Sequence, residues 1–271
     1  MTSVSRLLAL SATFLPAIAP HLAAAEPPAP APAMQAPEQS PAQTAERTSV
    51  NSVRVDQPVI AVTFDDGPSA ALTPRLLDIL KQRGVRATFF VLGQLVQDHP
   101  EIVRRAVDEG HEIGNHSWDH KALNRLAEGG LRHELADTSE VISKVTGRPV
   151  TLMRPPYGAT NPRLNKAIEK EYGMKVILWS VDPLDWKDRK AQLVEQRILK
   201  ETQPGAVILA HDIHPSTIEA MPATLDALLA KGYKFVTVSE LLRMESMQPA
   251  PPAKAPEAKP AAVPSTPPRQ S

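Results

Sequence analysis

Between residues 58 and 243 the sequence alternates between short apolar segments and longer amphipathic ones, which limits the possible folds more than any other feature. The amphipathic segments carry ordinary helix signals, with a proline at the first helical position, as in Asn161-Pro162, and a glycine such as Gly173 at the end. The apolar segments are nearly continuous runs, as in strands that are covered on both faces. We therefore expect a mostly parallel sheet of the α/β class, with strands at 58–64, 86–92, 111–115, 150–154, 174–180, 206–210 and 234–238, and helices at 74–83, 100–109, 131–145, 162–172, 189–201 and 216–230. Residues 239–244 close the domain.

Polar residues directly follow five of the seven expected strands. In parallel α/β folds, ligand-binding and catalytic groups gather at the C-terminal ends of the strands. An open sheet brings only neighbouring strand ends together, whereas a ring of strands brings all of them to one place. We therefore expect a barrel of the (β/α)7 type with catalytic groups at the C-terminal ends of its strands, in the clusters 63–68, 115–120, 154–158, 182–186 and 211–214.

The two ends of the chain differ in composition from its middle. Six prolines lie in 26–57 and eight in 244–271, whereas 10 of the 11 aromatic residues lie in 58–243. Segments rich in Pro and Ala that lack aromatic residues bury too little apolar surface to fold. We expect one folded domain at 58–243, with a disordered linker at 26–57 and a disordered tail at 244–271. Such segments are solvated tails or, alternatively, tethers to a polymer meshwork.

Residues 1–25 are typical of an export signal. Arg6 is followed by an apolar run at 7–19 that is too short to span a bilayer, and three alanines at 23–25 fit a cleavage site. An uncleaved anchor is the alternative, which the prolines of this segment disfavour. We expect an exported protein, located in the periplasm or secreted and associated with the cell wall. Because no other stretch approaches 18 apolar residues, the mature protein should have no transmembrane segment.

Charge and cysteine content exclude several classes of function. The chain has 30 Lys and Arg against 30 Asp and Glu, so no net field attracts nucleic acid or an anionic membrane. It has no cysteine, which excludes disulfides, thiolate catalysis, cysteine-ligated zinc and iron–sulfur clusters. Any metal site must therefore be built from His, Asp or Glu.

His116 and His120 are the best candidates for metal ligands. Four residues apart, they can direct both imidazoles at one point, and Asp66 at the end of the first expected strand is the best third ligand. Two histidines and one carboxylate suit hydrolytic Zn²⁺, but also Fe²⁺, Co²⁺ or Mn²⁺. On its own, an H-x-x-x-H pair is more often surface chemistry or packing, so the argument depends on the surrounding clusters.

Further ionisable residues flank these candidates. Asp65 precedes Asp66, and because neighbouring side chains of a strand point in opposite directions, the two carboxylates can have different roles. Arg154 can pair with Asp65 and keep it ionised. His211 follows another strand, where Asp185 or Asp182 would favour its imidazolium form and make it a general acid. The alternatives are a simple turn at the two aspartates and a structural role for the histidine.

Together, the motifs TFDDGP, HSWDH, RPPYG, DPLDW and LAHDIH resemble, in the same order, the five motifs of the polysaccharide deacetylase family, the NodB-homology carbohydrate esterases of family four. The resemblance covers 58–243 and implies a distorted (β/α) barrel with one divalent metal ion, usually Zn²⁺, with Co²⁺, Ni²⁺, Mn²⁺ or Fe²⁺ as alternatives. Carried over position by position, it implies the following roles: Asp65 as catalytic base, oriented by Arg154; Asp66, His116 and His120 as metal ligands; His211 as general acid, tuned by Asp185; the backbone N–H of Tyr157 as oxyanion donor; and Trp186 and Leu209 as the pocket for the acetyl methyl group.

The implied reaction is hydrolysis of the N-acetyl group of N-acetylglucosamine residues in an extracytoplasmic polysaccharide, with peptidoglycan as the first expectation. Asp65 would take the proton of the attacking water, and His211 would protonate the departing amine. Chitooligosaccharide is the runner-up substrate, and hydrolysis of O-acetyl groups on xylan would use the same residues. We expect a monomer whose partner is the polysaccharide, without nucleic acid.

Three rival functions use similar residues. A glycosidase needs two carboxylates on either side of a glycosidic bond; adjacent Asp65 and Asp66 leave little room for this, although Asp185 could serve. A non-haem iron oxygenase shares the ligand set, but it needs a site for a keto acid and no general acid. A carbohydrate-binding module would tolerate loss of the base or the acid, and this sequence retains both.

Overall fold

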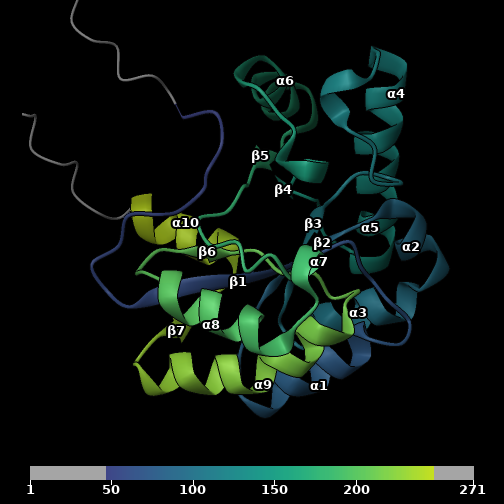
Figure 1. Ribbon diagram of the computed structural model, residues 1–271. Coiled ribbons are helices and arrows are strands. Elements are labelled where there is room, and N and C mark those ends of the chain that lie inside the picture. Colours follow the sequence, from purple (N-terminus) through teal and green to yellow (C-terminus); the bar gives the residue numbers. More distant parts are fainter. Residues whose placement is uncertain (1–46, 247–271) are drawn as a thin grey trace, which may run out of the picture. The chain divides into compact units, whose positions relative to one another are not determined.

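A computed structural model of the chain describes residues 47–246 (Figure 1). Within this part, seven parallel strands form one curled sheet in the order β5-β4-β3-β2-β1-β6, and β7 also pairs with β1. The expected distorted barrel of parallel strands is confirmed, as a curled half-barrel whose later strands are very short. The strands are β1 (Val59–Asp65), β2 (Thr88–Val91), β3 (Glu112–Asn115), β4 (Leu152–Met153), β5 (Lys175–Val176), β6 (Val207–Ile208) and β7 (Lys234–Phe235).

Helices connect these strands, and Figure 1 shows α8 and α9 side by side along one flank of the sheet, where they pack against each other. None of the helices within residues 47–246 is both long and apolar enough to cross a bilayer. The α-helices are α1 (Thr73–Gln82), α2 (Gly93–Asp98), α3 (Pro100–Asp108), α4 (Glu128–Arg132), α5 (Thr138–Thr146), α6 (Pro162–Tyr172), α7 (Asp185–Asp188), α8 (Ala191–Glu201), α9 (Pro215–Ala230) and α10 (Val238–Ser246), and the other helical turns are η1 (Leu123–Arg125), η2 (His133–Asp137) and η3 (Pro156–Gly158).

The helices at 74–83, 100–109, 162–172, 189–201 and 216–230 are confirmed to within three residues at each end, and the closing segment 239–244 is helical as part of α10. The helix expected at 131–145 is present as an unbroken helical segment made of α4, η2 and α5, and only its π-helical turn η2 was not expected. The short helices α2 and α7 were not expected, since segments of four to six residues carry little periodic signal.

Strand β1 forms the centre of the sheet and has partners along both edges. The backbone groups of its odd-numbered residues form hydrogen bonds with the segment around β6. One of these runs from Ala61 N to Ala206 O at 2.9 Å. Its even-numbered residues use the other edge, as in the bond from Val236 N to Ile60 O at 3.0 Å, so β7 pairs with the first part of that edge and β2 with the rest. Isolated bridges, one of them between Val181 and Ile208, span the opening between β5 and β6.

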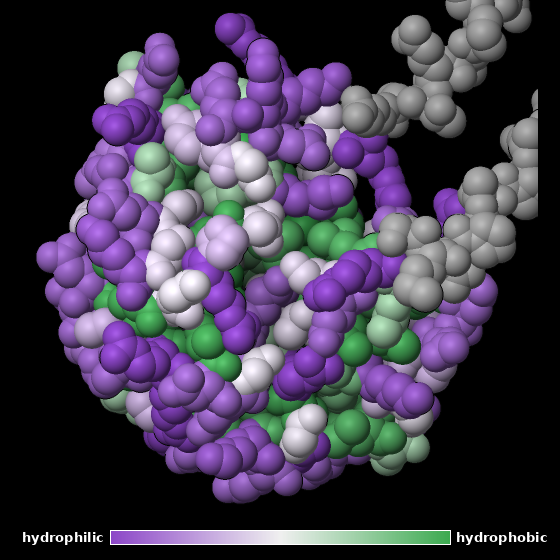
Figure 2. Space-filling view, turned by 180° about the vertical axis from the view of Figure 1, so that it is seen from behind, coloured by the Kyte–Doolittle hydropathy of each residue, from purple (hydrophilic) through white to green (hydrophobic). Residues whose placement is uncertain are grey.

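The two faces of β1 separate the two parts of the core. Ile60, Val62 and Phe64 pack outward in a cluster with residues of the surrounding helices. Val59 and Ala61 belong to a second cluster inside the curled sheet. Because side chains alternate along a strand, Thr63 and Asp65 follow on this inner face, so the interior changes from apolar to polar toward the C-terminal end of β1. On the outer surface, hydrophilic residues dominate the periphery of the face in Figure 2, and hydrophobic residues lie in recesses nearer its centre.

The folded part begins earlier than the sequence predicted. Val50 and Val53 are only 6% and 3% exposed, and they belong to the inner cluster. Val50 bridges to Ile177, and Val53 N donates to Gly205 O at 2.9 Å. The boundary expected at residue 58 is therefore wrong for residues 47–57. The signal at 1–25, the rest of the linker and the tail from 247 onward lie outside the described residues.

Candidate active site

The five polar clusters meet at one pocket of about 310 Å³ at the C-terminal ends of the strands. Eight of the ten residues named from the sequence line it, and Arg154 and Asp185 lie directly behind two of them. The structure therefore brings together every residue that the sequence analysis selected, although their chemical roles stay predictions. The pocket is lined by Asp65, Asp66, His116, His120, Pro155, Tyr157, Gly158, Trp179, Asp182, Trp186, Leu209 and His211.

Asp66, His116 and His120 form the candidate metal site. Asp66 Oδ1 lies 3.2 Å from Nε2 of each histidine, and the three ligand atoms are close enough together to hold one ion. Asp66 Oδ1 is buried and has no hydrogen-bond partner, which fits an atom that binds a cation. His116 Nδ1 contacts Arg154 O at 2.7 Å, a contact that directs Nε2 toward Asp66. The residues therefore fit a divalent metal ion.

The charges of this cluster also suit a metal. Burial alone would raise the pKa of Asp66, but its close contacts with the imidazoles of His116 and His120 lower it to about 2. Burial and the neighbouring His116 lower the pKa of His120. Asp66 is thus ionised and His120 is neutral near pH 7, the protonation states that metal ligands require.

Several residues of the pocket have a left-handed backbone. Left-handed φ angles cost free energy for residues other than glycine and concentrate at functional sites. Asp66 at 73° leaves the strand geometry, so its side chain enters the same pocket as that of Asp65 instead of pointing away from it. The two carboxylates thus line one pocket but have different partners, Arg154 for Asp65 and the two histidines for Asp66. Two other pocket residues are left-handed, His120 at 67° and Tyr157 at 62°, and so are Ser117 at 75° and Leu184 at 54° in the adjoining loops.

Asp65 pairs with Arg154, as expected. Arg154 Nη1 donates to Asp65 Oδ1 at 2.7 Å, and the arginine is 0% exposed. The same nitrogen donates to Thr63 Oγ1 at 2.7 Å, and the guanidinium lies 4.3 Å from the ring centre of Phe90. A buried arginine held by so many contacts fixes the direction of its carboxylate partner. Thr63 was not selected from the sequence, although its inner-face position on β1 was a usable signal.

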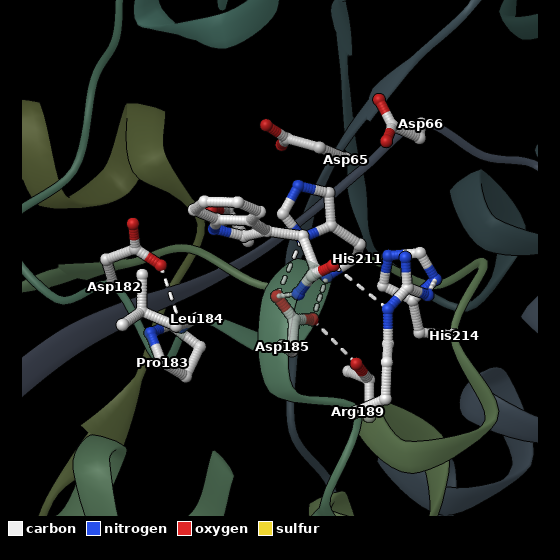
Figure 3. Close-up of polar contacts among 12 residues, drawn as sticks. Asp65, Asp66, Asp182, Pro183, Leu184, Asp185, Arg189, His211 and His214 are labelled. Carbon is white, nitrogen blue, oxygen red and sulfur yellow. Dashed lines mark hydrogen bonds and ion pairs between the residues drawn. The ribbon is translucent and has the colours of Figure 1, made fainter.

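His211 is held by Asp185 and not by Asp182 (Figure 3). Asp185 Oδ1 contacts His211 Nδ1 at 2.8 Å, and Asp185 Oδ2 accepts from His211 N at 2.8 Å and from Thr217 Oγ1 at 2.6 Å. Asp182 instead accepts a hydrogen bond from Leu184 N at 2.8 Å. Burial alone would lower the pKa of His211, but Asp185 outweighs it and raises the pKa to about 9. The choice between the two aspartates, open in the sequence, falls on Asp185.

Aromatic and apolar residues form the rest of the pocket. Trp186 and Tyr157 stand at its rim, with 47% and 71% of their surfaces exposed, whereas Leu209 is buried. The Tyr157 ring lies edge-on to that of His120, with the ring centres 4.4 Å apart. Trp179 also lines the pocket and was missed, because it lies inside an expected strand segment with no polar motif beside it.

Comparison with known proteins assigns the family. The sequence model described as "Polysaccharide deacetylase" matches residues 52–177. A "Peptidoglycan-N-acetylglucosamine deacetylase" of Bacillus cereus is 38% identical over 193 residues, which are 69% of this chain and 90% of that protein. The peptidoglycan-N-acetylglucosamine deacetylase PgdA of Listeria monocytogenes is 45% identical over 182 residues, which are 67% of this chain but only 38% of PgdA.

The fold agrees with this assignment. The structure of the peptidoglycan deacetylase PdaC from Bacillus subtilis matches with a TM-score of 0.67 and 43% identity, covering 70% of this chain and 93% of that one. PdaC is named a peptidoglycan-N-acetylmuramic acid deacetylase, and the match spans 40% of its full length. This chain thus matches less than half the length of PgdA and PdaC, but nearly all of the Bacillus cereus protein. The chain belongs to the polysaccharide deacetylase family.

Proposed function

We propose that this protein hydrolyses the N-acetyl groups of N-acetylglucosamine residues in peptidoglycan, in a metal-dependent reaction outside the cytoplasm. One observation carries the proposal: a cluster of two histidines and one carboxylate lies in the same pocket as an arginine-held aspartate and an aspartate-held histidine. The names of PgdA and of the Bacillus cereus relative support the choice of polymer and sugar. The expected export is part of this proposal, and its signal lies outside the described residues.

Asp66, His116 and His120 would hold the metal ion, with Zn²⁺ as the first expectation and Co²⁺, Ni²⁺, Mn²⁺ or Fe²⁺ as alternatives. When bound, a divalent ion supplies polarisation of the acetyl carbonyl and makes a water easier to deprotonate. The described residues supply three ligands, so coordination positions would remain for water and substrate.

Asp65 and His211 would divide the proton transfers between them. Asp65 lines the pocket as a carboxylate held by Arg154, so it can take a proton from the attacking water. His211 carries a proton near pH 7 because its pKa is about 9, and it can give that proton to the departing amine. Water adds to the carbonyl carbon, the C–N bond breaks, and acetate and a free amino sugar result.

The remaining pocket residues would bind the acetyl group and the sugar. Leu209 and Trp186 are the proposed site of the acetyl methyl group, which needs an apolar surface, and the N–H of Tyr157 is the proposed donor to the oxyanion. Peptidoglycan is preferred to chitooligosaccharide and to acetylated xylan because the named relatives act on peptidoglycan.

The test is acetate release from peptidoglycan, N-acetylglucosamine oligomers and acetylated xylan, with and without a chelator. We expect release from peptidoglycan that the chelator abolishes and added Zn²⁺ restores.

His211→Ala should slow the hydrolysis of amide substrates more than that of esters, because an amine leaves poorly without an acid. The matched control is Asp226→Asn, which removes an exposed carboxylate that pairs with Arg83 away from the pocket. Full activity in the presence of chelator, or release only from xylan, would contradict the proposal.

A further inference from the structure

The loop at residues 116–121 carries both histidines of the candidate metal site and needs support from outside itself. Ser117 and His120 have left-handed φ angles, which persist only where the surroundings enforce them. The N-terminus of α2 holds two carbonyl groups of this loop, through bonds from Gly93 N to Ser117 O and from Gln94 N to Trp118 O. The N–H groups between the two histidines need a separate acceptor.

Glu134 supplies that acceptor. Its Oε2 accepts hydrogen bonds from Trp118 N at 2.7 Å and from Asp119 N at 3.3 Å. Its Oε1 lies 3.3 Å from Nζ of Lys121. Glu134 is only 1% exposed, and a buried carboxylate is costly unless hydrogen bonds and charges compensate it. These two hydrogen bonds and the ion pair all come from the loop at 116–121, so the side chain and the loop hold each other in place.

Glu134 lies in the π-helical turn η2 (His133–Asp137). A π-helical turn holds more residues than an α-helical one, so it changes the direction in which the following side chains point, and such turns are frequent at functional sites. The next residue of the turn, Leu135, accepts from Asn115 Nδ2 at 2.9 Å through its carbonyl group. Asn115 Oδ1 in turn accepts from Ser117 N at 2.7 Å. The same turn therefore holds the loop beside His116 and again before His120.

We infer that Glu134 is a positioning residue that sets the geometry of the metal site through the backbone of Trp118 and Asp119. The inference rests on the metal site of the proposed function and adds a residue that none of the five motifs contains. Glu134 does not belong to the cluster that could hold the ion, so it acts on His120 indirectly.

The experiment measures Zn²⁺ affinity by competition with a chromophoric chelator for the wild type and four variants. Glu134→Ala should weaken Zn²⁺ binding about 10- to 100-fold, the usual cost of removing a group that orients metal ligands. Glu134→Gln should stay within about threefold of the wild type, because the amide oxygen can accept the same two hydrogen bonds. The matched control is Glu140→Ala on α5, whose exposed carboxylate pairs with Lys144 and should leave the affinity unchanged.

A second readout separates positioning from a general loss of structure. Activity of Glu134→Ala should recover as Zn²⁺ is raised to saturation, because Glu134 touches neither the ion nor the pocket. If Glu134→Ala does not fold, Glu134→Asp replaces it, since the shorter side chain withdraws from both N–H groups and should also weaken binding. Wild-type affinity in Glu134→Ala or Glu134→Asp, or equal losses in the Ala and Gln variants, would overturn the inference. A wild type that binds no Zn²⁺ would overturn the proposed metal site as well.

Discussion

At the scale of single residues, the two adjacent aspartates show how neighbours in sequence acquire different partners. Asp65 ends β1 in regular strand geometry and meets the guanidinium of Arg154. Asp66 turns into the left-handed region and meets His116 and His120. One carboxylate thus lies beside an arginine and the other beside two histidines, within one pocket.

Asp65→Asn should retain Zn²⁺ and lose activity. The substitution leaves the three candidate ligands intact, but it removes the proposed base, and a general base typically contributes 10²- to 10⁴-fold in rate. We expect kcat to fall by about that factor, while Zn²⁺ content per folded chain stays as in Asp226→Asn. Normal turnover by Asp65→Asn would show that another group is the base.

Asp185→Asn should move the alkaline limb of the pH–rate profile to lower pH. His211 must be protonated to act as an acid, and the charge of Asp185 raises its pKa to about 9. Without that charge, burial lowers the pKa toward or below the ordinary value of about 6.5, so activity should begin to fall at a lower pH.

The matched control for this shift is Asp182→Asn, which removes a carboxylate from the same pocket without touching His211. Its alkaline limb should stay where the wild type has it. Equal shifts in the two variants would mean that the general field of the pocket, and not the contact with Asp185, sets the pKa of His211.

At the scale of elements, the segment at residues 47–57 acts as part of the barrel. Its valines fill the inner cluster, and its backbone bonds to residues beside β5 and β6. It passes so close to Gly205 that a Cβ there would lie 1.7 Å from Val53 O. Gly205 also has a φ of +79°, which favours glycine. Its backbone angle and the close approach of Val53 therefore both exclude a residue with a side chain.

Gly205→Ala should destabilise the protein far more than Gly84→Ala. Gly84 has a similar φ of +61° but nothing within 4 Å of the added carbon, so it reports the backbone cost alone, about 1–2 kcal/mol. Gly205→Ala adds a clash with the segment and should cost about 3 kcal/mol more. Urea unfolding of both variants measures the difference, and equal free energies of unfolding would show that the segment is not packed as described.

At the scale of the whole molecule, the candidate metal site joins parts of the chain that are distant in sequence. Asp66 comes from the end of β1 and the histidines from the loop after β3. In the sheet, β2 lies between β1 and β3, so an ion bound at the candidate site would link two strands that do not pair directly.

Zn²⁺ should therefore raise the free energy of unfolding. A ligand that binds only the folded state stabilises it by about 4 kcal/mol when its free concentration is 1,000 times its dissociation constant. Urea unfolding with Zn²⁺ and with chelator should show this difference in the wild type. His120→Ala should lose most of it, and equal stabilisation of that variant would place the ion elsewhere.

Much of the fold was predictable because it depends on neighbouring residues. The seven strands and most helices follow from apolar runs, Pro and Gly signals that lie within a few positions of one another. The order of the motifs along the chain, each after a strand, was enough to predict that Asp65, Asp66, His116, His120 and His211 meet at one pocket. Trp179 and Glu134 were not predicted, because nothing in their immediate surroundings marks them.

By itself, the sequence determined the class of fold, the set of chemical groups and the strand ends at which they stand. Each of these follows from residue types and spacings within a short stretch of the chain. Only the tertiary structure decided that Asp185 holds His211, that Val50 belongs to the core and that a π-helical turn supports the histidine loop. Each of these depends on a contact between residues far apart in the chain, which forms only when the barrel has curled and brought them together.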